Sequence, residues 1–226
     1  MAENNITRLF LVRHGSTQLS AEDRFAGAIN PDLSEDGVFQ AQRLAERLAD
    51  DEVTAIYCSP MLRTVHTARI LATPGRLSVS ERDGLREIGH GHWEGMLRAE
   101  VEKLYPDEYV AWEEDPFTFA PAGGESGVQV IARALPVIRE IVVTHRGQNV
   151  IVVSHKATLR LVISSLLGFD ARGYRDRLDQ SPASLNVLDF KDTVHVRLML
   201  FNDISHYKDQ PQRADGRLSK WWNENG

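Results

Sequence analysis

The sequence predicts an α/β fold, a three-layer sandwich in which helices flank a mostly parallel central sheet, together with an inserted cap segment. Short apolar runs with the length of buried strands alternate with longer segments whose apolar residues recur at helical spacing. A loop rich in Gly and His, followed by short helical pieces, interrupts this alternation, and we expect residues 88–125 to form the cap. The composition is that of a globular protein, with 42% hydrophobic and 26% charged residues.

The first third of the chain predicts two strands, each followed by a helix. In order, they are a strand at 9–12, a helix at 34–50, a strand at 55–58 and a helix at 59–72. Ser34 has a hydroxyl that suits an N-cap, and the apolar residues after it follow at helical spacing. We expect Ser59 to cap the second helix and Pro60 to take its first position, which places Arg63 in the first turn.

The second half of the chain predicts two more helices and three more strands. They are a helix at 127–145, a strand at 149–154, a helix at 157–167 and a late pair of strands at 185–190 and 194–201. Ser126 is expected to cap the first of these helices. A mostly polar tail follows at 208–226. Because a domain has about 150 residues, we expect residues 1–226 to form a single domain.

Charge and composition exclude several classes of protein. The formal net charge of −6 gives no general attraction to nucleic acid or to an anionic membrane, so an anion site would have to be built locally. Cys58 is the only cysteine, which excludes an intrachain disulfide and a four-cysteine zinc site. No apolar stretch of about 18 residues occurs, so we expect a cytoplasmic location without membrane contact. A homo-oligomer stays possible.

Polar side chains with phosphate chemistry follow the ends of the predicted strands. Arg13 and His14 come directly after the first strand, Arg63 follows the second, and His155 follows the strand at 149–154. In open α/β sheets, ligands bind beyond the carboxyl ends of the strands, so these residues should converge. Two guanidinium groups suit a phosphate dianion, and an imidazole can attack phosphorus. The set predicts phosphoryl transfer.

Four separated motifs carry a resemblance to a known family. They are Leu-Val-Arg-His-Gly-Ser-Thr at 11–17, Ser-Pro-Met-Leu-Arg-Thr at 59–64, Leu-Arg-Glu-Ile at 85–88 and Val-Ser-His at 153–155. In order and spacing they resemble the histidine phosphatase superfamily, also called phosphoglycerate-mutase-like. The resemblance covers roughly residues 7–202.

The resemblance implies a covalent mechanism without metal or cofactor. His14 would attack phosphorus and become a phosphohistidine, while Arg13, Arg63 and His155 would hold the phosphoryl oxygens. Glu87 would act as the proton donor and acceptor. Physical chemistry agrees, because a neutral imidazole is nucleophilic and fixed cations stabilise the transferring group. We therefore expect a phosphomonoesterase that hydrolyses a small phosphorylated metabolite.

Two residues depart from the family pattern. Ser20 stands where many members carry an Asn that contacts phosphate, and a hydroxyl donates only one hydrogen bond. Lys156 stands where a Gly commonly follows the second histidine, and Arg160 lies one helical turn later. We expect Ser20 and Lys156 to contribute to phosphate binding, and we hypothesise that Lys156 and Arg160 select a substrate with an additional anionic group.

Two other groups of residues invite a different chemistry. The segment from Cys58 to Arg63 invites comparison with cysteine phosphatases, but only four residues intervene, where those enzymes have five. His90 and His92, with Glu87 and nearby acids, would be ligands for a divalent metal if they shared one side of an extended loop. A substrate-facing loop without metal is favoured, because the family motif already explains Glu87.

Within the family, hydrolysis is favoured over two alternatives. Mutases typically show Glu-Arg-His-Tyr-Gly after the acid, whereas residues 87–95 resemble the phosphatase pattern, with Gly89 replacing a usual acidic or amide residue. A cofactor-dependent phosphoglycerate mutase stays the first alternative. A binding module that recognises a phosphorylated ligand without turnover would have a broken set of catalytic residues, and here the set is complete.

Overall fold

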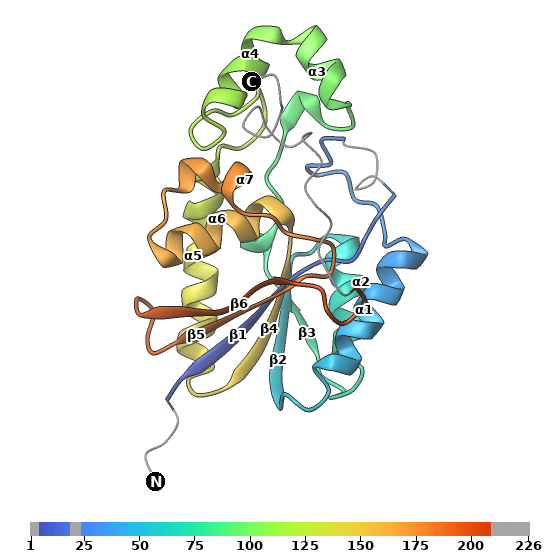
Figure 1. Ribbon diagram of the computed structural model, residues 1–226, viewed down its shortest axis with the longest axis vertical. Helices are drawn as coiled ribbons and strands as arrows, with labels where there is room; N and C mark the ends of the chain where they lie inside the picture. Colours follow the sequence, from blue (N-terminus) through green and yellow to red (C-terminus); the bar gives the residue numbers. More distant parts are fainter. Residues whose placement is uncertain (1–4, 19–23, 209–226) are drawn as a thin grey trace.

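Six strands form one sheet in the order β3-β2-β4-β1-β5-β6 (Figure 1). The computed structural model describes residues 5–18 and 24–208. The strands are β1 (Thr7–Arg13), β2 (Val53–Cys58), β3 (Val79–Glu81), β4 (Asn149–Ser154), β5 (Leu185–Phe190) and β6 (Val196–Asp203). The four strands from β3 to β1 pair in parallel, whereas β5 runs antiparallel to both of its neighbours. The predicted mostly parallel sheet in an α/β fold is confirmed.

Helices cover both faces of this sheet, which makes the three layers (Figure 1). One side carries α1 (Glu35–Arg47) and α2 (Leu62–Ala72), and the other carries α5 (Gly127–Thr144) and α6 (Lys156–Leu167). Short turns of helix complete the body. These are η2 (Asp83–Leu85), η4 (Ala171–Gly173) and α7 (Tyr174–Arg177).

Alternation along β1 shows how the sequence divides the core between the two faces. Leu9 and Leu11 pack in one apolar cluster with α5 and α6, whereas Phe10 and Val12 pack in another with α1 and α2. Successive side chains of a strand point to opposite faces, so a continuous apolar run is required when both faces are covered. Burying each large apolar side chain contributes about 1.5 to 3 kcal/mol. This packing fixes where β1 ends, and so where the residues after it lie.

The segment at 88–125 lies beyond the carboxyl ends of the parallel strands (Figure 1). It contains η3 (Gly91–Trp93), α3 (Arg98–Leu104) and α4 (Pro106–Glu114). Several of its apolar residues pack with Phe25 in a separate cluster. The buried members are Phe25, Trp93, Val101, Tyr109 and Trp112. We propose that this segment is the cap expected from the sequence.

Side-chain caps explain the starts of α1 and α5, whereas the cap predicted for α2 is absent. Ser34 caps α1 by accepting a hydrogen bond from the amide of Gly37, and Ser126 caps α5 in a capping box with Gln129. The prediction that Ser59 caps α2 is wrong, because that helix begins at Leu62 and has no side-chain cap. The hydroxyl of Ser59 is instead engaged with a histidine, as described below.

Other differences from the sequence predictions are small. The three-residue edge strand β3 was not predicted, because so short a segment shows no periodicity. The polar tail lies outside the described residues after Lys208. Among the described residues, no helix is long and apolar enough to cross a membrane.

Candidate active site

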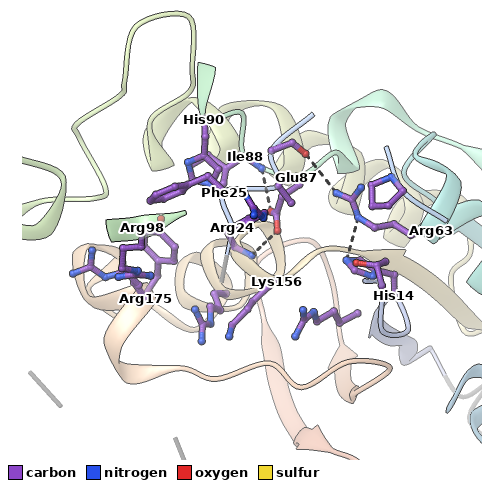
Figure 2. Close-up of a pocket in the computed structure, with 18 of the residues that line it drawn as sticks. His14, Arg24, Phe25, Arg63, Glu87, Ile88, His90, Arg98, Lys156 and Arg175 are labelled. Carbon is purple, nitrogen blue, oxygen red and sulfur yellow. Dashed lines mark hydrogen bonds between the residues drawn. The ribbon is translucent and has the colours of Figure 1, made fainter. Parts of the chain in front are cut away.

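Residues from four separate segments line or border one cavity of 230 Å³ at the carboxyl ends of the strands (Figure 2). Arg13 ends β1 and His14 follows it, Arg63 is the second residue of α2, and Glu87 follows η2. The ring of His155, directly after β4, lies 5.2 Å from the ring of His14. The convergence predicted from the strand ends is therefore present.

His14 is held as a neutral imidazole with one defined tautomer. Its Nδ1 donates to the carbonyl of Gly15 at 2.7 Å, and its Nε2 accepts from Nε of Arg63 at 3.2 Å. Burial and the charges of Arg63 and Arg13 lower the pKa of His14 well below 6.5. The lone pair that a nucleophile needs is thus placed on Nε2, facing the cations.

Gly15, next to His14, packs closely against the first turn of α1. In the structure, a Cβ at Gly15 would lie 2.4 Å from the carbonyl oxygen of Gly37. The glycine is therefore required by the close packing of this loop against the first turn of α1.

His155 is buried and faces Ser59. Its Nε2 lies 2.9 Å from the hydroxyl oxygen of Ser59, and its Nδ1 is buried without a hydrogen-bond partner among the described residues. Burial and the neighbouring Arg63 lower the pKa of His155 well below 6.5. Because the oxygen of Ser59 accepts from the amide of Met61, its hydrogen is available to Nε2. That arrangement leaves Nδ1 protonated and able to donate to an oxyanion.

Backbone carbonyls anchor the two guanidinium groups. Arg13 donates from Nη1 to the carbonyl of Gln180 at 2.6 Å, and Arg63 donates from Nη1 to the carbonyl of Ile29 at 2.9 Å. Both side chains are buried, which is costly for a charge without a counter-ion and favours binding of an anion. The Nε of Arg13 is buried and has no hydrogen-bond partner among the described residues.

The N-terminus of α6 orients Glu87. One carboxylate oxygen accepts from the amides of Ile88 and Thr158 at 3.0 and 3.2 Å, and the other accepts from the amide of Ala157 at 3.3 Å. Amides at a helix N-terminus favour an anionic partner. The carboxyl group is therefore fixed at the cavity wall, where it can exchange a proton with a bound molecule.

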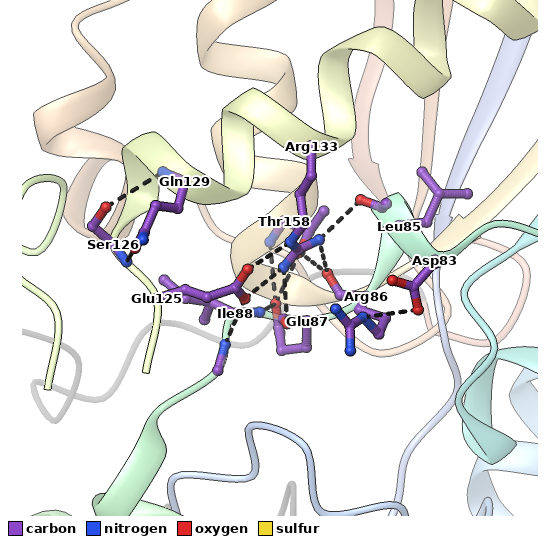
Figure 3. A network of polar contacts seen from close by, with 12 residues as sticks. Asp83, Leu85, Arg86, Glu87, Ile88, Glu125, Ser126, Gln129, Arg133 and Thr158 are labelled. Atoms are coloured by element: carbon purple, nitrogen blue, oxygen red, sulfur yellow. Dashed lines mark hydrogen bonds and ion pairs between the residues drawn. The ribbon is translucent and has the colours of Figure 1, made fainter. Parts of the chain in front are cut away.

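A second layer of contacts fixes the loop that carries Glu87 (Figure 3). Arg133 of α5 donates to the carbonyls of Gly84, Arg86 and Glu87 and forms a two-point ion pair with Glu125. Glu125 also accepts from the amide of Gly89. One arginine thereby ties four points of the loop to a rigid helix. The sequence analysis assigned no role to Arg133.

Lys156 and Arg160 lie on one side of α6 and both line the cavity. Nζ of Lys156 lies 3.2 Å from Oδ1 of Asp179, and Nη2 of Arg160 lies 2.9 Å from the same oxygen. The predicted positive charge beside His14 is therefore present, together with a carboxylate that the sequence analysis missed. Ser20, the other departure from the family pattern, lies outside the described residues.

The outer wall of the cavity comes largely from residues that sequence reasoning did not assign. Phe25 and Trp112 supply aromatic surface, and Arg24, Arg98 and Arg175 supply charge. The guanidinium groups of Arg98 and Arg175 lie 5.2 and 4.5 Å from the ring centre of Trp112. Their positions depend on which way side chains of the 88–125 segment and α7 point, and no periodicity in the sequence gives that direction.

The structure disfavours both alternative chemistries. Cys58 is fully buried in the cluster with α1 and α2, and burial raises the pKa of its thiol to about 12, so it does not supply a thiolate. The ring of His90 packs on Phe25, whereas His92 contacts Glu108 and Tyr105. Within residues 5–18 and 24–208, no three His, Cys, Asp or Glu side chains gather as metal ligands would.

Comparison with known proteins identifies the family. The model of the histidine phosphatase superfamily (branch 1) matches residues 9–204. Phosphoserine phosphatase 1 of Hydrogenobacter thermophilus is 39% identical over 165 residues, which are 73% of this chain and 78% of that protein. Glucosyl-3-phosphoglycerate phosphatase of Mycolicibacterium vanbaalenii is 35% identical over 170 residues, 72% of this chain and 75% of that protein.

A solved structure is similar to this chain over most of its length. Bacillus stearothermophilus YhfR has a TM-score of 0.84 at 29% identity and covers 89% of this chain and 100% of that one. The family model thus spans both histidines, and the two relatives described above are named as phosphatases of small phosphorylated metabolites. The chain belongs to the histidine phosphatase superfamily and is a phosphatase.

Proposed function

We propose that the chain hydrolyses phosphate monoesters of small metabolites through a phosphohistidine on His14, without a metal ion. The observation that carries the proposal is the neutral tautomer of His14, whose Nε2 lone pair points toward the buried cation Arg63. A nucleophile fixed in this way beside permanent positive charge suits attack on a phosphate dianion. Metal-independent chemistry is supported by the same cations, which supply the charge stabilisation that a metal would otherwise give.

The first half of the reaction forms the covalent intermediate. Nε2 of His14 attacks phosphorus, and the bond from phosphorus to the ester oxygen breaks. Glu87, which is protonated when the phosphate dianion is bound beside it, gives its proton to the leaving alkoxide. Arg13, Arg63 and Nδ1 of His155 hold the equatorial oxygens through the transition state. The products of this step are the alcohol, a phosphohistidine and the carboxylate of Glu87.

The second half returns the enzyme to its starting state. A water molecule attacks the phosphoryl group while Glu87 takes one of its protons, and the bond from phosphorus to nitrogen breaks. Inorganic phosphate leaves, His14 is again neutral, and Glu87 is again protonated. The helix-terminal amides that hold Glu87 keep the same carboxyl group in place for both proton transfers.

The charge of the cavity and the names of the relatives support one class of substrate. Two of them are named for phosphoserine and glucosyl-3-phosphoglycerate, and both of those compounds carry a carboxylate beside the phosphate ester. The cavity here is lined by several cations in addition to those around His14. We therefore favour a phosphorylated carboxylic acid or a sugar phosphate as the substrate.

An aryl phosphate assay tests the proposal. Hydrolysis is measured from about pH 5 to about pH 8, with and without chelator, for the native protein, for His14→Ala and for His195→Ala. His195 is an exposed histidine on the β5–β6 hairpin and serves as the matched control. We expect activity that resists chelator, that His14→Ala removes and that His195→Ala leaves intact, with acid-labile phosphate on the native protein after rapid quench.

Two results would contradict this function. Loss of activity with chelator would indicate a metal-dependent reaction. A second contrary result would be activity toward 3-phosphoglycerate that requires added 2,3-bisphosphoglycerate. That result would indicate a mutase, because a mutase must retain a bisphosphate intermediate and re-orient it.

A further inference from the structure

Lys156 and Arg160 share one counter-ion at the side of the cavity. Lys156 is the first residue of α6, and Arg160 follows one turn later, so the two side chains lie on the same face of the helix. Both contact the same oxygen, Oδ1 of Asp179, at 3.2 and 2.9 Å. In the view of Figure 2, Lys156 lies between Arg175 and His14, and all three residues line the same cavity.

Gln180 connects Asp179 and its two cations to Arg13 on the phosphate-binding side of the cavity. Gln180 follows Asp179 and accepts through its carbonyl from Arg13 at 2.6 Å. The loop at 179–180 therefore places a third cation next to the first two. Of the described residues, Asp179 is the carboxylate with which Lys156 and Arg160 form their ion pairs. Even when Glu87, which lines the same cavity, is counted, three cations face two carboxylates, and this leaves an excess of positive charge.

The burial of this group makes the excess charge significant. The side chain of Arg160 is only 5% exposed, and its Nε is buried without a hydrogen-bond partner among the described residues. A buried cation with an unsatisfied donor is costly, and an anion that reaches it relieves that cost. Burial, followed by the charges of Arg160 and Arg13, lowers the pKa of Lys156 to about 8.

We infer that Lys156 and Arg160 form a second anion subsite, which selects phosphate esters that carry an oxyanion group, such as a carboxylate, besides the phosphate. Asp179 holds the two cations in position and neutralises one of them, so one positive charge is left for the ligand. The inference rests on the proposed function in one respect: the phosphate of the same ligand is taken to occupy the site around His14.

Paired substrates measure this selection directly. The first pair is 3-phosphoglycerate and glycerol 3-phosphate, and the second is phosphoserine and phosphoethanolamine; within each pair the compounds differ by a carboxylate. The quantity compared is the ratio of kcat/KM for the carboxylate-bearing ester to kcat/KM for its partner. The variants are Lys156→Met, Asp179→Asn and, as a matched control, Lys191→Met in the exposed hairpin after β5.

In at least one pair, we expect the kcat/KM of the native protein to be about tenfold or more higher for the carboxylate-bearing ester. Lys156→Met should remove most of that preference, because it lowers kcat/KM for the carboxylate-bearing ester several-fold more than kcat/KM for its partner. Asp179→Asn should increase the preference, because the counter-ion is lost. Lys191→Met should leave the ratio unchanged. Equal loss for both esters in Lys156→Met, or no preference in the native protein for either pair, would overturn the inference.

A binding measurement separates this inference from the mechanism. Calorimetry on His14→Asn compares the affinities for the same paired ligands without turnover. Tighter binding of the carboxylate-bearing ligands, with a smaller difference once Lys156→Met is added, would support the subsite. This holds even if the aryl phosphate assay rejects the phosphohistidine route. Equal affinities within both pairs would overturn the subsite while leaving that route intact.

Discussion

Nε of Arg63 donates a hydrogen bond to Nε2 of His14, the lone pair that attacks phosphorus in the proposed reaction. Attack therefore requires that Arg63 exchange this bond for one to a phosphate oxygen. The same guanidinium keeps its bond to the carbonyl of Ile29 from a second nitrogen, which holds it beside the nucleophile during the exchange. The contact couples substrate binding to release of the nucleophile.

Arg63→Lys should lower kcat/KM by about a hundredfold or more. An ammonium group lacks the planar fork with which one nitrogen keeps the bond to Ile29 while another transfers its bond from His14 to phosphate. Steady-state kinetics on an aryl phosphate measures the loss. Arg69→Lys, an exposed change on the same helix, is the matched control and should keep native activity. Unchanged kcat in Arg63→Lys would contradict the role of the fork.

Arg133→Met should lower kcat more for alkyl phosphates than for aryl phosphates. Arg133 positions the loop of Glu87, and an alkoxide leaving group depends most on the proton that Glu87 supplies. The measurement is the slope of log kcat against the pKa of the leaving group, which should become steeper. Arg139→Met on the exposed face of α5 is the control. An equal loss for all esters would indicate a structural effect only.

Activity should persist on the acid side of pH 6.5, because burial and nearby cations keep His14 neutral there. Unfolding should become easier over the same range. The folded-state pKa of both His14 and His155 lies below the unfolded value, so the unfolded chain binds more protons and stability falls as pH drops through 6.5. Activity and urea midpoints at several pH values measure the two effects. A drop in kcat with an apparent pKa near 6.5 would contradict the neutral state of His14.

Gly15→Ala should reduce the free energy of unfolding by about 1 to 3 kcal/mol. The added Cβ would lie 2.4 Å from the backbone oxygen of Gly37, which cannot move without shifting α1. Urea denaturation compares this variant with Gly75→Ala, whose Cβ would meet only the flexible side chain of Leu77 at 3.3 Å. Equal midpoints for the two variants would contradict the packing explanation.

Alkylation with iodoacetamide should leave the native enzyme active and unlabelled. Cys58 is fully buried, and the pKa of its thiol is raised to about 12, so almost no thiolate exists near neutral pH. Cys58→Ala should likewise retain catalysis, with a small loss of stability from the missing sulfur. Mass spectrometry and the phosphatase assay report both results, and rapid inactivation by the reagent would contradict the assignment.

The sequence predicts the centre of the site well because strand ends are easy to locate. His14 and His155 follow continuous apolar runs, and parallel strands bring their carboxyl ends to one edge of the sheet. The role of Ser59 could not be read in the same way. Its hydroxyl suits a helix cap as well as a histidine partner, and only the three-dimensional register of α2 against β4 decides between them.

The residues that form the walls of the cavity could not be predicted from the sequence, for a related reason. Asp179 lies in an irregular loop, and its contact with Lys156 depends on how that loop returns to α6. Trp112 is apolar enough for a core and aromatic enough for a ligand contact, and it serves the cluster while also lining the cavity. Side-chain direction in such segments is a property of tertiary packing and not of local pattern.

The aromatic cluster around Trp93 shares no buried residue with the two clusters that flank the sheet. The nucleophile and its cations come from the sheet and α2, whereas part of the wall comes from residues such as Trp112 in the separate cluster. Evolution and protein engineering can therefore exchange the wall while keeping the reaction centre. A library randomised at Arg98 and Trp112 is the natural starting point for redirecting this scaffold to new esters.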